Sequence, residues 1–135
     1  MEIRIPYGKS FITAQIPDQV GVDIFELPHT PAASNPTTVV RDALNDLLGE
    51  LSWSDLKEVQ SVAIAINDKT RPVPHYILLP PLLDQLESLG IPNDLITFFI
   101  AVGTHPPMTP EEFPTILPAE ILACYQVVSL SLIHI

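Results

Sequence analysis

Two apolar runs rich in β-branched residues, at positions 62–66 and 95–102, are the strongest pattern along this chain. Runs of this composition are typical of β-strands. Between them, leucines recur at helical spacing from His75 to Leu89, and Gly90 ends the periodicity. The order strand, loop, helix, strand and loop predicts two neighbouring parallel strands joined by a helix.

The first third of the chain carries shorter patterns. Residues 2–6 and 10–16 predict two short strands around a turn at residues 7–9. Residues 20–27 are a candidate for a further strand, and the proline-rich residues 28–36 predict a loop. The chain therefore starts with a β-rich lead-in before its first helix.

Capping signals predict further helical segments. Asn35 as N-cap and Pro36 at the first helical position predict a helix that ends at Gly49. Residues 51–59 predict a helical turn that starts at Ser54 and leads into the first apolar strand.

Prolines mark the starts or bends of two later helices. Pro80 and Pro81 either start the leucine-rich helix at its first turn or kink a longer one. A capping-box arrangement follows the second apolar strand. Its N-cap is Thr109, its first helical residue is Pro110 and its third is Glu112. A short helix is therefore predicted to begin at this point.

Composition and charge narrow the class of protein. A chain of 135 residues, 47% of them hydrophobic, suffices for one domain with a buried core, and a single cysteine excludes a disulfide framework and a cysteine zinc site. A net charge of −10 opposes binding to nucleic acid. No apolar run approaches membrane-spanning length, so we expect a cytoplasmic protein without a membrane partner. The expected fold is α/β, a mostly parallel sheet flanked by helices with a β-rich N-terminal lead-in, in an incomplete domain.

Polar motifs follow both apolar strands directly, at residues 67–74 and 103–112. They place Asp68, Arg71 and His105 at the carboxyl ends of neighbouring parallel strands, the edge at which ligands bind in open α/β sheets. A neutral imidazole, with an ordinary pKa of ~6.5, suits proton transfer to and from a hydroxyl group. A planar, permanently charged guanidinium suits a carboxylate. The motifs thus predict a site that can hold a small anion.

Each of these residues also has a structural interpretation. His105 could be a hydrogen-bonded loop residue, and Arg71 could form a surface ion pair. Asp68 could cap its own turn, orient Arg71, or bind a ribose or cofactor hydroxyl. These alternatives stay open at the level of the sequence.

Other residues with reactive or large side chains receive structural interpretations. We interpret Lys69 as solvated, His29 and His75 as structural or idle, Cys124 as a buried small apolar residue, and Trp53 as a packing residue.

The two motifs, Asn-Asp-Lys-Thr-Arg-Pro and Gly-Thr-His, each after a strand and at matching separation, resemble the amino-terminal part of the nickel-pincer lactate racemase family. The resemblance runs from about Ile3 to Val128. It implies inversion of C2 of a 2-hydroxy acid of the lactate type by reversible hydride transfer. It also implies a nickel pincer nucleotide that is tethered to a lysine and ligated through nickel by a histidine.

The resemblance further implies roles for individual residues. His105 matches the first of two acid/base histidines, and Arg71 matches an arginine that holds the substrate. Asp68 matches an acidic position, and with Thr104 we assign it to binding of cofactor or substrate. Pro106 departs from the family pattern, in which an arginine is expected after the histidine, and this removes a basic group near the site.

The end of the chain departs from the pattern of a natural protein. Residues 130–135 are the translation of CTG-TCT-CTT-ATA-CAC-ATC, which looks like the end of a transposon used to fragment DNA for sequencing. We therefore assign residues 1–128 to a partial lactate-racemase-like N-terminal domain and residues 129–135 to a sequencing-adapter artefact, so that His134 has no role. A natural edge strand is the alternative.

The family's second histidine, cofactor lysine and nickel-ligating histidine lie beyond Val128. The fragment alone is therefore predicted to be inactive, and the missing C-terminal part of its own chain is its expected partner. The alternative function is a non-catalytic α/β module that binds a nucleotide or small anion at the carboxyl ends of the strands.

Overall fold

The computed structural model describes residues 1–131, which fall into two compact units that divide between Pro31 and Ala32. The last four residues of the predicted adapter segment, 132–135, lie outside the described residues. Among residues 1–131, no helix is both long and apolar enough to cross a membrane.

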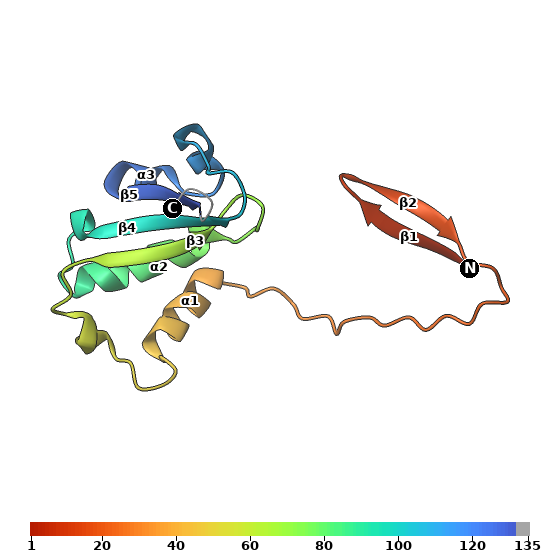
Figure 1. The fold of residues 1–135 in the computed structure, drawn as a ribbon. Helices are drawn as coiled ribbons and strands as arrows, with labels where there is room; N and C mark the ends of the chain where they lie inside the picture. The colour runs from red at the N-terminus through yellow and green to blue at the C-terminus, as the bar shows by residue number, and fades with distance from the viewer. Residues whose placement is uncertain (132–135) are drawn as a thin grey trace. The chain divides into compact units, whose positions relative to one another are not determined.

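The first unit is an antiparallel hairpin of β1 (Glu2–Tyr7) and β2 (Ser10–Gln15), as predicted (Figure 1). The turn between the strands uses Gly8 at a φ of +58°, which is a conformation that favours glycine. On one face of the hairpin, the guanidinium of Arg4 lies 4.0 Å above the ring of Phe11.

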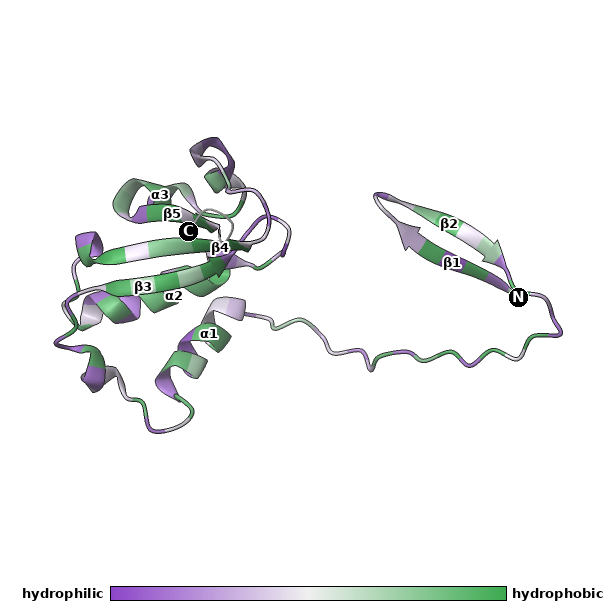
Figure 2. Ribbon diagram, viewed as in Figure 1, coloured by the Kyte–Doolittle hydropathy of each residue, from purple (hydrophilic) through white to green (hydrophobic). Residues whose placement is uncertain are grey.

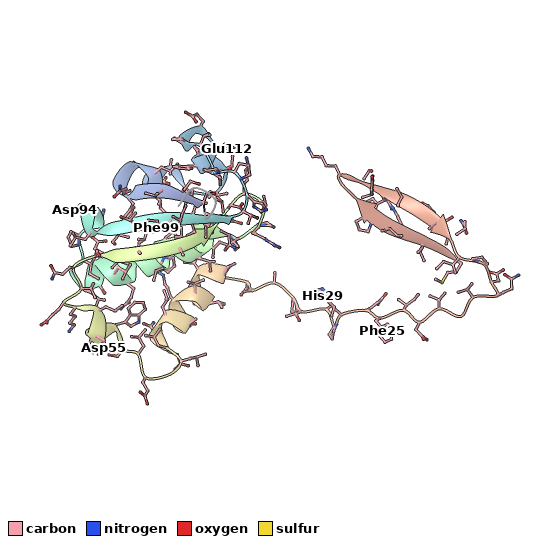
Figure 3. The ribbon with its side chains drawn as sticks, viewed as in Figure 1. Phe25, His29, Asp55, Asp94, Phe99 and Glu112 are labelled. Atoms are coloured by element: carbon pink, nitrogen blue, oxygen red, sulfur yellow. The ribbon has the colours of Figure 1, made fainter. Side chains whose placement is uncertain are left out.

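The candidate strand at residues 20–27 is wrong. These residues form an irregular segment that pairs with no strand among residues 1–131, and Figure 3 shows Phe25 projecting from it. Phe25 and Leu27 are 93% and 94% exposed. Apolar residues alone do not make a strand, because the ladder of hydrogen bonds needs a neighbouring strand.

The second unit is built on a parallel sheet in the order β3-β4-β5 (Figure 1), with strands β3 (Val62–Asn67), β4 (Ile96–Gly103) and β5 (Gln126–Ser131). The predicted order of strand, helix and parallel strand is confirmed by β3, α2 (His75–Ser88) and β4. The strand that propensity favours near the end of the chain is also present, and β5 includes residues 129–131 of the predicted adapter segment.

One face of this sheet carries the hydrophobic core. Along β4 the side chains alternate, so that Phe98 and Ile100 are fully buried whereas Phe99, labelled in Figure 3, lies on the opposite face. Figure 2 shows the apolar strands of this sheet against α2. The core joins β3 and β4 to α2, to α3 (Ala119–Cys124) and to the connection before α3, through the residues Ile66, Leu79, Leu83, Leu86, Ile91, Ile96, Phe98, Ile100, Val102, Met108, Phe113, Leu117 and Ile121.

Helix α2 begins at His75, so Pro80 and Pro81 lie inside the helix and do not start it. At its beginning, the amides of Ile77 and Leu78 donate to the carbonyl of Pro74 at 2.8 and 3.1 Å. The leucine stripe of this helix faces the core as predicted.

Helix α1 (Pro36–Asn45) starts as predicted, with the Thr38 amide donating to the Asn35 side chain at 3.1 Å, but it ends before Gly49. The indole N–H of Trp53 donates to the Leu44 carbonyl at 2.7 Å. That carbonyl would otherwise accept from residue 48, so Trp53 satisfies the end of the helix. Trp53 belongs to the predicted helical turn, the 3-10 helix η1 (Trp53–Leu56).

Two further 3-10 helices complete the second unit. They are η2 (Asn93–Leu95) and η3 (Pro110–Thr115). The capping box predicted for η3 is present, because the Thr109 amide donates to the Glu112 side chain at 3.1 Å. Cys124 is exposed, which corrects its interpretation as a buried residue, because it is the last residue of the short helix α3.

Candidate functional site

The loops after β3 and β4 meet at the carboxyl edge of the sheet, as the sequence predicts. In the parallel register Asn67, the last residue of β3, stands beside Ala101, and β4 continues for two more residues to Gly103. The two loops are joined by a hydrogen bond of 2.8 Å between Nδ1 of His105 and Oδ2 of Asp68. This pair, separated by 37 residues in the chain, is the centre of the candidate site.

Asp68 uses its two carboxylate oxygens for two different purposes. Oδ1 accepts from the amide of Thr70 at 3.0 Å and from the hydroxyl of Thr70 at 2.6 Å, whereas Oδ2 faces His105. The turn-capping interpretation of Asp68 is therefore confirmed, and the carboxylate contacts His105 in addition. The side chain of Asp68 is only 5% exposed.

These hydrogen bonds favour the charged carboxylate. The Thr70 hydroxyl, followed by the His105 ring, holds the pKa of Asp68 below its ordinary value against the opposing effect of burial. Asp68 is therefore an anion at neutral pH, and a carboxylate can only accept hydrogen bonds. The neighbouring Nδ1 of His105 must then be the donor.

His105 combines a fixed nitrogen with an accessible ring. Its side chain is 51% exposed, and when Nδ1 carries the proton the neutral ring keeps a lone pair on Nε2. Its backbone is held by a turn in which the His105 amide donates to the Val102 carbonyl at 3.0 Å, after Gly103 at a φ of +61°. The hydroxyl of Ser131 in β5 donates to the His105 carbonyl at 3.5 Å.

Arg71 lies on the surface next to this pair, because its amide donates to the Asp68 carbonyl at 3.1 Å and closes the turn. Within residues 1–131 its guanidinium has no ion-pair partner. It lines a hollow of about 500 Å³. The other residues around this hollow are Lys69, Pro72, Val73, Pro74, His75, Tyr76, Thr115 and Ile116.

Thr104 is exposed beside His105, and in the described part of the chain its side chain makes no hydrogen bond. The structure therefore places Thr104 in the loop of the candidate site and leaves it outside the hydrogen-bonded group around Asp68.

A second link joins the two loops. The ammonium group of Lys69 forms an ion pair with the carboxylate of Glu112 in η3, so Lys69 is not simply solvated. Glu112, labelled in Figure 3, also caps η3 through the Thr109 amide. The bonds from Lys69 and Thr109 hold the pKa of Glu112 below its ordinary value.

Two features of the site escaped the sequence analysis. One is the bond between Asp68 and His105, which depends on the way the two strands pair. The other is the role of Thr70, although an Asp followed two residues later by Thr is a local pattern in which the carboxylate commonly binds the backbone two residues ahead.

This arrangement defines an α/β domain with a carboxylate–histidine pair and an exposed arginine at the carboxyl ends of its parallel strands. Residues 7–132 match the lactate racemase N-terminal domain. The chain belongs to this family.

Individual relatives agree with the match. The chain is 33% identical to the lactate racemase of Lactiplantibacillus plantarum and 32% identical to that of Thermoanaerobacterium thermosaccharolyticum, in each case over 82% of this chain and 26% of the relative. It is also similar to the solved structure of the lactate racemase apoprotein from Thermoanaerobacterium thermosaccharolyticum. The TM-score is 0.75 at 30% identity, over 96% of this chain and 30% of that chain. The chain spans about a quarter of the length of these curated relatives.

Proposed function

We propose that this chain supplies an acid/base histidine and a carboxylate-binding arginine to a racemase or epimerase of 2-hydroxy acids of the lactate type. The observation that carries the proposal is the 2.8 Å bond between Asp68 and His105, with Arg71 three residues after Asp68 and without an ion-pair partner among residues 1–131. In this proposal the whole enzyme includes a C-terminal part that follows residue 128 and contributes a second histidine.

His105 moves the proton of the substrate hydroxyl. As a hydride leaves C2, Nε2 of His105 accepts the hydroxyl proton, and the substrate becomes a 2-oxo acid. The Asp68 carboxylate then faces the imidazolium that has formed and stabilises it through Nδ1. Return of the hydride to the opposite face of C2, with a proton to the oxygen, gives the other enantiomer.

Arg71 holds the substrate by its carboxylate. A guanidinium presents two parallel N–H donors to a carboxylate, which fixes the orientation of C2 as well as its distance from the histidine. The prolines around Arg71, at positions 72 and 74, restrict the loop, so less conformational entropy is lost when the substrate binds.

In this proposal a nickel pincer nucleotide would be the hydride acceptor of the whole enzyme. Within residues 1–131 no group of three or more His, Cys, Asp or Glu side chains could by itself hold a metal ion. We assign to this chain the proton transfer and the binding of the carboxylate. The lysine and the histidine that hold the cofactor are proposed to lie after residue 128.

A second candidate function is a non-catalytic module that binds a nucleotide or small anion. The hollow beside Arg71, with Lys69 at its margin, favours this alternative. It predicts that binding of an anion depends on Arg71 and is indifferent to His105.

The test is to extend the gene past codon 128 from the source DNA, produce the enzyme with its cofactor, and follow the conversion of L-lactate to D-lactate. His105→Gln should lower kcat by about 10²–10⁴-fold, the range that general acid–base catalysis contributes. His29→Gln, in the loop of the first unit, is the matched control and should keep the activity. An extended protein that binds lactate through Arg71 without racemising it would support the binding module.

A further inference from the structure

We propose that Thr70 is a positioning residue for the acid/base histidine: its hydroxyl fixes one oxygen of Asp68, so that the other oxygen faces Nδ1 of His105 and leaves Nε2 free. The kinetic consequence of this inference rests on the proposed function. Its structural consequence, the position of the proton on the His105 ring, does not.

The geometry around Asp68 carries the proposal. The Thr70 hydroxyl donates to Oδ1 at 2.6 Å and the Thr70 amide donates to the same oxygen at 3.0 Å, while Oδ2 lies 2.8 Å from Nδ1 of His105. The terminal torsion of an aspartate is soft, and one donor leaves the plane of its carboxylate free to tilt. Two donors on Oδ1 fix this plane and therefore the direction of Oδ2.

The Thr70 hydroxyl gives Oδ1 of Asp68 a second donor in addition to the Thr70 amide. The Thr70 hydroxyl is the only side-chain donor on Oδ1 among the described residues, and its hydrogen bond is the largest of the effects that keep Asp68 charged. An Asp68 that tilts or takes up a proton accepts less well from Nδ1, and the imidazole then loses its preference for the proton on that atom. Thr70 thus acts on the base through Asp68.

Thr70 is also a position where the hydroxyl can be removed cleanly. The residue is exposed, so replacing its hydroxyl by a methyl group leaves no cavity in the core. Thr70→Val keeps the backbone amide and the β-branched shape, and removes only the donor. Thr70→Ser keeps the donor and removes only the methyl group.

The first measurement uses the 135-residue chain labelled with ¹⁵N in its histidine rings, at a pH at which His105 is neutral. Long-range ¹⁵N–¹H NMR reports which ring nitrogen carries the proton. We expect the proton on Nδ1 in the native chain and in Thr70→Ser, and a mixture of both tautomers in Thr70→Val. Thr97→Val, which removes a hydroxyl at the opposite end of β4, is the matched control and should give the native spectrum.

The second measurement uses the extended, cofactor-loaded enzyme. Thr70→Val should lower kcat by roughly fivefold to tenfold, the loss that corresponds to the net contribution of one hydrogen bond, and Thr70→Ser should restore the rate. A native tautomer in Thr70→Val overturns the proposal, and so does an equal loss in Thr70→Ser. If the extended enzyme racemises nothing, the proposed function fails, and the NMR measurement alone decides the role of Thr70.

Discussion

His75 is the first residue of the helix after β3 and His105 lies in the loop after β4, and the surroundings of these two histidines differ. His75 is 4% exposed, and its Nδ1 lies 3.1 Å from the carbonyl oxygen of Ile116. His105 is half exposed, and its Nδ1 lies 2.8 Å from the carboxylate of Asp68. The two rings therefore make hydrogen bonds of similar length to acceptors of different charge, one in the core and one at the surface.

The comparison shows which surroundings suit a histidine for proton transfer. The enclosed ring of His75 ties the start of α2 to the chain that precedes α3, which is a structural role, as its sequence context indicates. His105 instead has an accessible ring and a charged partner that can stabilise an imidazolium. Accessibility and the charge of the acceptor, more than the presence of a hydrogen bond, separate the two roles.

The largest expected difference between the two histidines is in stability, and it is tested by removing each ring in turn. His75→Ala leaves a cavity and an unpaired carbonyl on Ile116, so we expect the free energy of unfolding to fall by about 2–4 kcal/mol. His105→Ala removes a half-exposed ring whose hydrogen bond to Asp68 is screened by solvent, so a loss of about 1 kcal/mol is expected. Urea denaturation of the 135-residue chain measures both values, and equal losses would contradict the distinction.

The charge of Asp68 predicts a smaller effect that depends on pH. Because its pKa is lower in the folded chain than the ordinary value of 3.8, the unfolded chain binds the proton more readily. The resulting stability is fully present above that ordinary pKa and is lost as the pH falls through the folded pKa. The free energy of unfolding should therefore fall less between about pH 5 and pH 2 in Asp68→Asn than in the native chain.

His105→Ala provides the internal comparison for this pH effect. It removes one of the three hydrogen bonds that lower the pKa of Asp68 and keeps the two from the hydroxyl and the amide of Thr70. Its free energy of unfolding should change with pH less than that of the native chain and more than that of Asp68→Asn. The same pH dependence in all three proteins would show that the carboxylate is not held by these partners.

The sequence predicted those parts of the fold that depend on periodicity. Apolar runs and a leucine stripe are sufficient to place β3, α2 and β4, and parallel strands then bring their carboxyl ends together. The predicted end of α1 was wrong, because the indole of Trp53, eight residues after Asn45, hydrogen-bonds a carbonyl of the last turn of the helix. No pattern within the helix encodes this contact.

The sequence predicted which loops form the candidate site, but it did not predict the hydrogen bonds between them. Asp68 and His105 follow their strands directly, so their proximity can be inferred from topology. The division of the Asp68 oxygens between Thr70 and His105 depends on where two loops of different length turn back, and a single sequence does not contain that geometry. Local turn chemistry could have indicated Thr70 alone.

The smallest expected effect concerns the second link between the loops, the ion pair of Lys69 and Glu112. Both side chains are substantially exposed, at 48% and 34%, so solvent and salt screen their attraction. Lys69→Met and Glu112→Gln should each change Tm by no more than about 2 °C, since glutamine at the third helical position still caps η3.

The NMR signal of the proton on Nδ1 of His105 sharpens this last prediction. If the bond between Asp68 and His105 sets the mutual position of the loops, that signal stays native in both variants, at low and at high salt. If Lys69→Met shifts the signal, and added salt shifts the native chain in the same direction, the exposed ion pair controls the approach of the two loops. The exposed ion pair of Lys69 and Glu112 would then determine the geometry of the partly buried pair of Asp68 and His105. Burial indicates the opposite, namely that the partly buried pair fixes the loops.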